Sequence, residues 1–200
     1  TIAESGMSIT VTEQGVGTPT TFTISASSTM DELIDNINNE TGGVVTANLN
    51  DDGKLVLSNN TGAAITVEDD STSGSGFSKT ATTFNGFLKL EGLDDEPIRI
   101  TAGNKGLASV GNEADLKSIG FRQVTADTLD DGFTVIGAEL TNPGSSLAQG
   151  DLAINGVDIF DSEITVSSLS DELTLINSKA AETGVTASAF FSKSFTIADE

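Results

Sequence analysis

The sequence predicts an α+β fold made of small antiparallel β-sheets, each packed by one short helix. Ser and Thr make up 48 of the 200 residues and alternate with Val, Ile, Leu and Phe, which is typical of half-buried strands. Turn sequences separate these runs, and three stretches follow the helical period instead. Leu, Ile, Val and Phe together make up 53 of the 200 residues, which is enough for a buried core.

The strand runs are bounded by turns rich in Asp, Asn and Gly. Residues 7–12 and 21–25 show the alternation clearly. Asn155-Gly156 lies between the apolar runs 152–154 and 157–160, and therefore predicts a tight hairpin with a primed turn. The other predicted turns are Asp51-Asp52-Gly53, Asn60-Thr61-Gly62 and Asp130-Asp131-Gly132.

The first predicted helix has a capping box that begins at Ser28 or Thr29, and it ends at Gly42-Gly43. Its apolar stripe is Met30, Leu33, Ile34 and Ile37. A stripe at this spacing predicts a helix face that packs on a sheet, because residues three and four apart lie on the same side.

Two further stretches predict helices. One is capped by Ser168 and Asp171 and is followed by Gly184. Its apolar stripe is Leu169, Leu173, Ile176 and Ala180. A third, shorter helix is predicted over residues 112–119, where Gly120 stops it.

The first two helices belong to an internal repeat. Asp-Glu-Leu recurs at 31–33 and 171–173, and Glu-Thr-Gly at 40–42 and 182–184. In each copy a hairpin precedes the helix and a strand pair follows it, at 44–49 with 54–57 and at 184–189 with 194–197. A looser middle copy has strands at 87–90 and 98–101 before its helix and at 133–136 after it.

These repeats predict three hairpin-helix-hairpin units, at residues 1–75, 76–143 and 144–200. The boundaries fall in the Ser- and Gly-rich stretches 71–76 and 142–146, which are typical of linkers or long surface loops. The sequence leaves open whether the copies are independent domains or share one sheet.

Composition excludes several classes of function. The chain has no Cys, His, Trp or Tyr, so it lacks thiol chemistry, the usual neutral-pH base and the aromatic anchors of sugar sites. Its net charge of −21 disfavours binding to nucleic acid and to anionic membranes. No apolar run is long enough for a membrane span. Because the chain opens at Thr1 and shows no signal peptide, we expect a fragment or a processed product whose export signal lies outside it.

Paired carboxylates are the remaining catalytic candidates. They are Asp69-Asp70, Asp94-Asp95-Glu96 and Asp130-Asp131. Glycoside hydrolysis needs two carboxyl groups across a cleft, one of them with a raised pKa, whereas adjacent acids in a polar turn stay solvated and ionised. We therefore predict that the chain is not an enzyme, and that it has no catalytic, cofactor-binding or metal site and needs no cofactor.

One loop partly resembles a calcium-binding sequence. Asn48, Asn50, Asp52 and Gly53 imitate the first half of an EF-hand loop, but position twelve is Asn59 rather than a bidentate Glu, and strands are expected on either side. A hairpin turn is the favoured interpretation. Asn39-Glu40-Thr41 and Asn59-Asn60-Thr61 fit the glycosylation sequon, a short pattern that occurs often by chance.

The repeated unit resembles the repeat of bacterial flagellins and hook-associated proteins. The clearest similarity covers about residues 22–67 and 151–189, including the Ile-Asn words Ile37-Asn38 and Ile176-Asn177. Residues 114–121 also resemble a flagellin phrase. The long terminal helices through which flagellins polymerise have no counterpart here.

The resemblance implies the outer, variable region of a flagellin, a structural part of an extracellular motility filament. Its partners would be other flagellin subunits, bound through core helices outside this chain, while the isolated piece would be monomeric. Its many Ser and Thr side chains would be candidates for O-linked glycans. The alternatives are the corresponding domains of a filament cap or hook-associated protein and, in another class, a calcium-dependent surface adhesin repeat.

Overall fold

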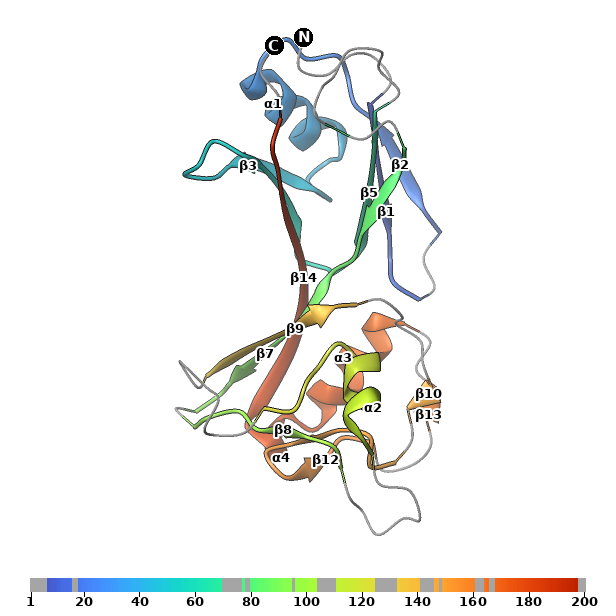
Figure 1. Ribbon diagram of the computed structural model, residues 1–200, viewed down its shortest axis with the longest axis vertical. Coiled ribbons are helices and arrows are strands. Elements are labelled where there is room, and N and C mark those ends of the chain that lie inside the picture. The colour runs from blue at the N-terminus through green and yellow to red at the C-terminus, as the bar shows by residue number, and fades with distance from the viewer. Residues whose placement is uncertain are drawn as a thin grey trace. The chain divides into compact units, whose positions relative to one another are not determined.

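The structure is a computed structural model that describes residues 7–15, 18–69, 77, 80–94, 96–103, 111–124, 133–140, 146–147, 149–160, 164–165 and 168–197. It consists of small antiparallel sheets and short helices (Figure 1). The longest helix in these ranges is α1 (Met30–Glu40), with 11 residues. The predicted α+β class without long terminal helices is therefore confirmed. None of the described helices is long and apolar enough to cross a membrane.

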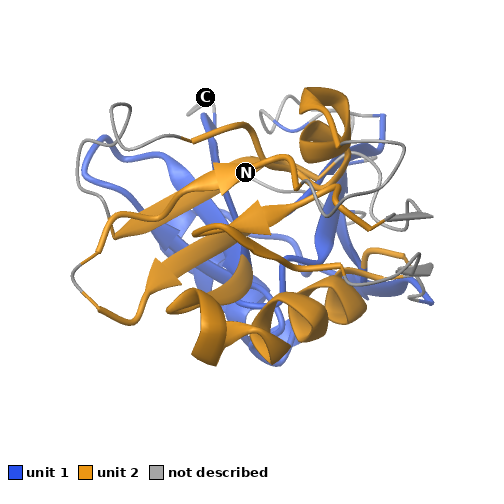
Figure 2. Cartoon of the chain, turned by 90° about the horizontal axis from the view of Figure 1, so that it is seen from below, with its two compact units in different colours: residues 1–13, 17–86, 190–200 blue, residues 14–16, 87–189 orange. Residues whose placement is uncertain are grey.

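The chain divides into two compact units (Figure 2). Unit 1 comprises residues 1–13, 17–86 and 190–200, and unit 2 comprises residues 14–16 and 87–189. The boundaries of these two units differ from those of the three predicted repeat units. Residues 1–75 lie almost wholly in unit 1, whereas residues 76–143 and residues 144–200 are each divided between unit 1 and unit 2.

One sheet of unit 1 has the strand order β2-β1-β5-β6, with antiparallel neighbours. Its strands are β1 (Met7–Thr12), β2 (Thr20–Thr23), β5 (Ala64–Asp69) and β6 (Thr82–Phe84). Met7, Ile9 and Val11 are buried while the Ser and Thr between them are half-buried. The apolar residues that alternate with Ser and Thr therefore lie on one face of β1 and point into the core, as expected for side chains that alternate along a strand.

The other sheet of unit 1 contains β3 (Thr46–Leu49), β4 (Leu55–Asn59) and the last part of β14 (Val185–Phe195). β3 and β4 form a hairpin, and β4 pairs with residues 191–195 of β14. First and third repeat copies therefore share a sheet, which answers a question that the sequence left open. Leu33 and Ile37 of α1 are fully buried in the core of this unit, with Leu55, Leu57 and Phe191.

The sheets of unit 2 are short. β7 (Phe87–Gly92) lies between β9 (Thr134–Glu139) and the first part of β14, and β11 (Ala153–Ile154) lies between β12 (Val157–Asp158) and β8 (Ile100–Thr101). The backbones of β10 (Ser146–Leu147) and β13 (Ile164–Thr165) form a separate pair. This unit has a core of its own, which includes Leu88, Leu90, Phe121, Phe160 and Ile176.

α1 and α3 begin at capping residues that the sequence predicts, whereas the cap of α2 is seen only in the structure. The hydroxyl of Thr29 accepts from the amide of Glu32 at 3.2 Å, and the Glu32 carboxylate accepts from the amide of Ser28 at 2.7 Å. In unit 2, Asn112 and Asp115 form a capping box at α2 (Glu113–Ser118), and Ser168 caps α3 (Leu169–Ser178). These contacts satisfy amides that a helix start leaves unpaired.

Three details differ from the sequence-based expectations, and some of the expected turns and linkers are not described. The helix predicted between Ser168 and Gly184 is divided, since Lys179 ends α3 and a separate turn, α4 (Ala180–Thr183), follows. The strand pair expected at 184–189 and 194–197 is one continuous strand, β14, because residues 190–193 contain no Gly, Pro, Asn or Asp to form a turn. β7 and β8 do not pair with each other. The Asp130-Asp131-Gly132 turn and the 71–76 stretch lie outside the described residues, as does all but Ser146 of 142–146.

Candidate functional site

The Ile-Asn word of the first repeat joins helix α1 to strand β3. Ile37 is fully buried in the core of unit 1. The next side chain, Asn38, donates from Nδ2 to the carbonyl of Ala47 at 3.0 Å and accepts at Oδ1 from the amide of Ala47 at 2.8 Å. The Asn38 amide group thus pairs with both backbone groups of one strand residue, as a neighbouring strand would.

The third repeat contains the same clamp in unit 2. Asn177 donates to the carbonyl of Ala187 at 2.9 Å and accepts from the Ala187 amide at 2.7 Å. Ile176 is fully buried, like Ile37. We call these two arrangements the Asn38 clamp and the Asn177 clamp. Adjacent helix residues point about 100° apart, so the Ile fills the core while the Asn meets the strand alongside.

A threonine after each helix adds a second link. The Thr41 hydroxyl lies 2.8 Å from the carbonyl of Ile37 and 2.9 Å from that of Val45. The Thr183 hydroxyl lies 3.0 Å from the carbonyl of Lys179 and 3.4 Å from that of Val185. Both threonines are buried, and each bridges the end of a helix to the start of a strand.

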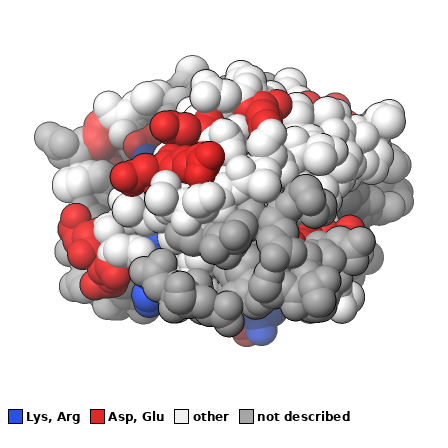
Figure 3. Space-filling model, turned by 90° about the horizontal axis from the view of Figure 1, so that it is seen from above, with Lys and Arg blue, Asp and Glu red and all other residues white. Residues whose placement is uncertain are grey.

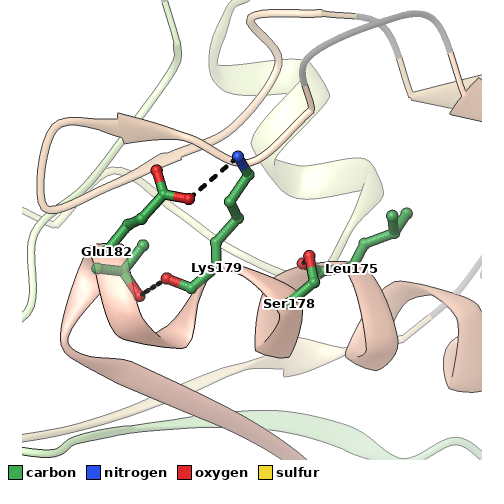
Figure 4. Close-up of polar contacts among 5 residues, drawn as sticks. Leu175, Ser178, Lys179 and Glu182 are labelled. Atoms are coloured by element: carbon green, nitrogen blue, oxygen red, sulfur yellow. Dashed lines mark hydrogen bonds and ion pairs between the residues drawn. The ribbon is translucent and has the colours of Figure 1, made fainter.

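The two copies reach this arrangement by different paths. In the third copy the threonine is the last residue of an extra turn, α4, and Lys179 before this turn forms an ion pair with Glu182 at 3.3 Å (Figure 4). Ser178 donates to the carbonyl of Leu175 at 2.7 Å in the turn before it (Figure 4). The clamp geometry is the same in spite of these differences, so it is the shared structural element of the repeat.

Of the predicted acidic candidates, the structure describes Asp69, Asp94 and Glu96. Asp69 is buried in β5, and Asp70, Asp95, Asp130 and Asp131 lie outside the described residues. Asp94 and Glu96 are exposed at a hollow of about 580 Å³ that is also lined by Pro97, Arg99, Thr101, Asn155 and Gly156. Within the described ranges, no group of three or more Asp, Glu, His or Cys could hold a metal ion.

The calcium-like loop is a hairpin turn. The Asn50 side chain accepts from the amides of Asp52 at 3.1 Å and Lys54 at 2.8 Å, so its oxygen is used within the β3–β4 turn. The sequon residue Asn59 is buried and donates to the carbonyl of Ala63 at 2.9 Å. Both asparagine side chains therefore form hydrogen bonds with backbone groups of their own turns.

Glu172 of α3 is a buried acid that is not among the acidic candidates predicted from the sequence. Its side chain is 2% exposed, and its Oε1 has no hydrogen-bond partner among the described residues. Desolvation by burial raises the pKa of Glu172 from 4.5 to about 8. The available signal was its position three residues after Leu169 and four before Ile176, on the apolar face of the helix.

Together these features define a class of protein: small α+β units whose recurring element is a helix clamped to a strand by an Ile-Asn pair. On the face drawn in Figure 3, carboxylates outnumber cations. Residues 8–61 match the family model described as the flagellin hook IN motif. This match covers β1 to β4, including α1 and the Asn38 clamp. No curated protein and no solved structure matched the chain.

The resemblance to flagellins and hook-associated proteins is thus confirmed for the first repeat copy. The chain is flagellin-like, and the motif assigns it a structural role in the flagellum, outside the cell and in assembly with flagellin subunits. The third copy lies outside the matched range, and its relation to the first rests on the identical clamp geometry.

Proposed function

We propose that this chain is the surface-exposed, variable region of a flagellin, and that it acts without catalysis. The matched motif in residues 8–61 carries the proposal, and the described part of the chain supports it because none of its helices is longer than 11 residues. Such a region contributes to the filament surface, whereas subunits polymerise through helices elsewhere in the parent protein.

The charge of the chain suits this role. A net charge of −21 keeps neighbouring acidic surfaces apart and favours solubility, at some cost in stability through self-repulsion. In dilute solution the isolated chain is then monomeric, and sedimentation that gave a tight dimer would contradict this. Exposed Ser and Thr are the proposed carriers of O-linked glycans, and an intact mass equal to that of the bare chain would exclude them.

Deletion of residues 1–200 from the parent gene, followed by electron microscopy, tests the proposal. We expect long filaments that are thinner or smoother than those of the wild type, because polymerisation lies elsewhere. A matched control carries Asn39→Ala, which changes one exposed side chain next to the Asn38 clamp and leaves filaments unchanged. Normal flagella after the deletion would contradict a flagellar role.

The description of the matched motif favours one further candidate, since it names the hook as well as flagellin. In that case the chain belongs to a filament cap or hook-associated protein and assists assembly. The same deletion distinguishes the two: loss of filaments, with flagellin released into the medium, would support the cap or hook-associated protein and oppose the bulk filament subunit.

A further inference from the structure

The strands that follow the two repeat helices come from stretches without charge. Residues 41–50, which contain β3, include no Asp, Glu, Lys or Arg, and neither do residues 184–192, which contain most of β14. In the whole chain, charged residues make up 20%. Residues 44–50 and 185–192 also lack Gly and Pro. Neutral, strand-forming segments of this kind pair with copies of themselves when an edge is open.

β3 is an edge strand of its sheet. Among the described strands its only neighbour is β4. The amide and the carbonyl of Ala47 are both bonded to Asn38, which comes from helix α1, so these groups point away from β4. Because backbone groups alternate in direction along a strand, those of Leu49 face the same open side.

Helix α1 blocks most of this open side. The Asn38 side chain occupies both backbone groups of Ala47, at 2.8 and 3.0 Å, and the Thr41 hydroxyl lies 2.9 Å from the carbonyl of Val45, just before β3. An added strand would need these same groups, since main-chain hydrogen bonds hold it in place. Within β3, only Leu49 then still faces the open side, which is too little edge for another strand.

The third repeat copy blocks β14 in the same way. Asn177 of α3 occupies the amide and the carbonyl of Ala187, and the Thr183 hydroxyl lies 3.4 Å from the carbonyl of Val185. This part of β14 precedes residues 191–195, which pair with β4. In both copies, therefore, a neutral strand has its backbone groups taken by an Asn and a Thr from the helical segment before it.

Other described edges are protected by different means. Pro19 precedes β2 at one edge of the four-stranded sheet, and β6 at its other edge has three residues. Proline and a short strand both limit strand addition. On β9, the amide of Ala138 donates to the carbonyl of Gly120 at 2.6 Å. Residues 41–50 contain neither a proline nor a charge, so β3 depends on Asn38 and Thr41.

We propose that Asn38 and Thr41, and likewise Asn177 and Thr183, block strand edges that would otherwise pair with the same strand of a second copy. This role is separate from the stability that the clamps provide, because it acts between molecules. The net charge of −21 on each copy opposes such pairing at long range, and salt at about 0.15 M screens this repulsion. The proposal does not depend on the place of the chain in a flagellum.

Sedimentation equilibrium of the full chain in about 0.15 M salt, up to about 1 mM protein, tests the proposal. We expect a monomeric wild type, and an Asn38→Ala variant that associates at concentrations at least about tenfold lower than any at which the wild type does. The matched control Asn39→Ala changes an exposed neighbour and stays monomeric. Ile37→Val, a second control, weakens the same helix through the core and leaves the edge blocked. A monomeric Asn38→Ala, or equal association of Ile37→Val, would overturn the proposal.

A lysine on the opened edge separates edge blocking from stability. Asn48 is an exposed residue of β3, and Asn48→Lys in the Asn38→Ala background adds a charge there without restoring the bonds to Ala47. We expect this double variant to be monomeric again, since a lysine at an edge opposes strand addition. Its urea midpoint should stay at that of Asn38→Ala. Association that persisted in the double variant would contradict pairing through β3.

Amide hydrogen exchange locates the contact. In dilute Asn38→Ala the Ala47 amide should exchange at least about tenfold faster than in the wild type, and it should slow again at concentrations where the variant associates. Protection that appeared on other strands but not at Ala47 would overturn the choice of edge. If circular dichroism shows that Asn38→Ala is unfolded, Thr41→Val replaces it in the sedimentation experiment, because this change uncovers the Val45 carbonyl and keeps the side-chain shape.

Discussion

Asn177 and Ala187 exchange two hydrogen bonds, at 2.9 and 2.7 Å, between the last turn of helix α3 and the strand that follows it. The same pair of bonds joins Asn38 to Ala47 in the other unit, at 3.0 and 2.8 Å. A strand residue beside a helix has no neighbouring strand to satisfy its amide and carbonyl, and the Asn side chain supplies both partners. The Ile-Asn word is thus a packing residue followed by a backbone clamp.

Replacing the clamp residue should destabilise the unit that contains it. Asn177→Ala leaves the amide and carbonyl of Ala187 without their partners, and we expect a loss of about 1–3 kcal/mol in the free energy of unfolding. Asn177→Asp keeps the acceptor and removes the donor, so its free energy of unfolding should lie between those of the wild type and Asn177→Ala. Urea denaturation followed by circular dichroism measures both.

The control for the clamp is Asn39→Ala, compared with Asn38→Ala in the same helix. Asn39 is exposed, so its loss should change stability by about 0.5 kcal/mol or less. If Asn38→Ala and Asn39→Ala were equally mild, the clamp would have no stabilising role and the repeat would depend on its apolar residues alone.

Glu172 should make stability depend on pH. Its folded-state pKa of about 8 is above the ordinary 4.5, so the folded chain holds a proton that the unfolded chain releases between these values. The contribution of this proton to the free energy of unfolding is fully present below pH 4.5 and is lost as the pH rises toward 8. By pH 7 the loss is on the order of 3 kcal/mol. Other acids contribute their own dependence, so a matched variant is needed.

Glu172→Gln is that variant, because it keeps the shape and removes the charge. We expect it to be more stable than the wild type at pH 7 and above, and to lose this advantage at pH 5. Thermal unfolding at pH 5, 7 and 8.5 measures the difference. Glu96→Gln, at an exposed position of the same unit, should show no such trend. A gain for Glu172→Gln that stayed constant across these pH values would argue against a buried proton.

The sequence predicted local features well and long-range pairing poorly. Helix starts at Thr29 and Ser168 depend on hydrogen bonds within three residues, and the capping pattern shows them directly. The pairing of Phe191 with Asn59 joins distant parts of the chain, and no local signal encodes it. Splitting β14 into two strands was wrong because alternation continues through Phe191 without a turn residue.

The recurring Ile-Asn word was visible in the sequence, but its function was not. Spacing indicates that Ile37 and Ile176 are buried, whereas the partner of the following Asn depends on where the next strand returns. Glu172 illustrates the opposite case. A carboxylate on the apolar face of a helix is usually solvated, and only the packed structure shows that it is buried.

The Asn155-Gly156 turn provides a further prediction, because one side chain there has two separable roles. Asn155 adopts a positive φ of 51°, a conformation that Asn tolerates better than Ala. Its Oδ1 accepts from the amide of Arg99 at 2.8 Å, and its Nδ2 donates to the carbonyl of Thr183 at 2.8 Å. The turn thereby bonds the residue before β8 and the last residue of α4, in addition to closing its own hairpin.

Asn155→Gly removes both side-chain hydrogen bonds without conformational strain, whereas Asn155→Ala removes them and adds strain. We expect the Gly variant to lose about 1–2 kcal/mol of unfolding free energy and the Ala variant about 1 kcal/mol more. Chemical denaturation of the two variants measures the difference. Equal losses would mean that the left-handed conformation has no cost for Ala at this position. If the Gly variant were as stable as the wild type, water would satisfy the backbone groups of Arg99 and Thr183 instead.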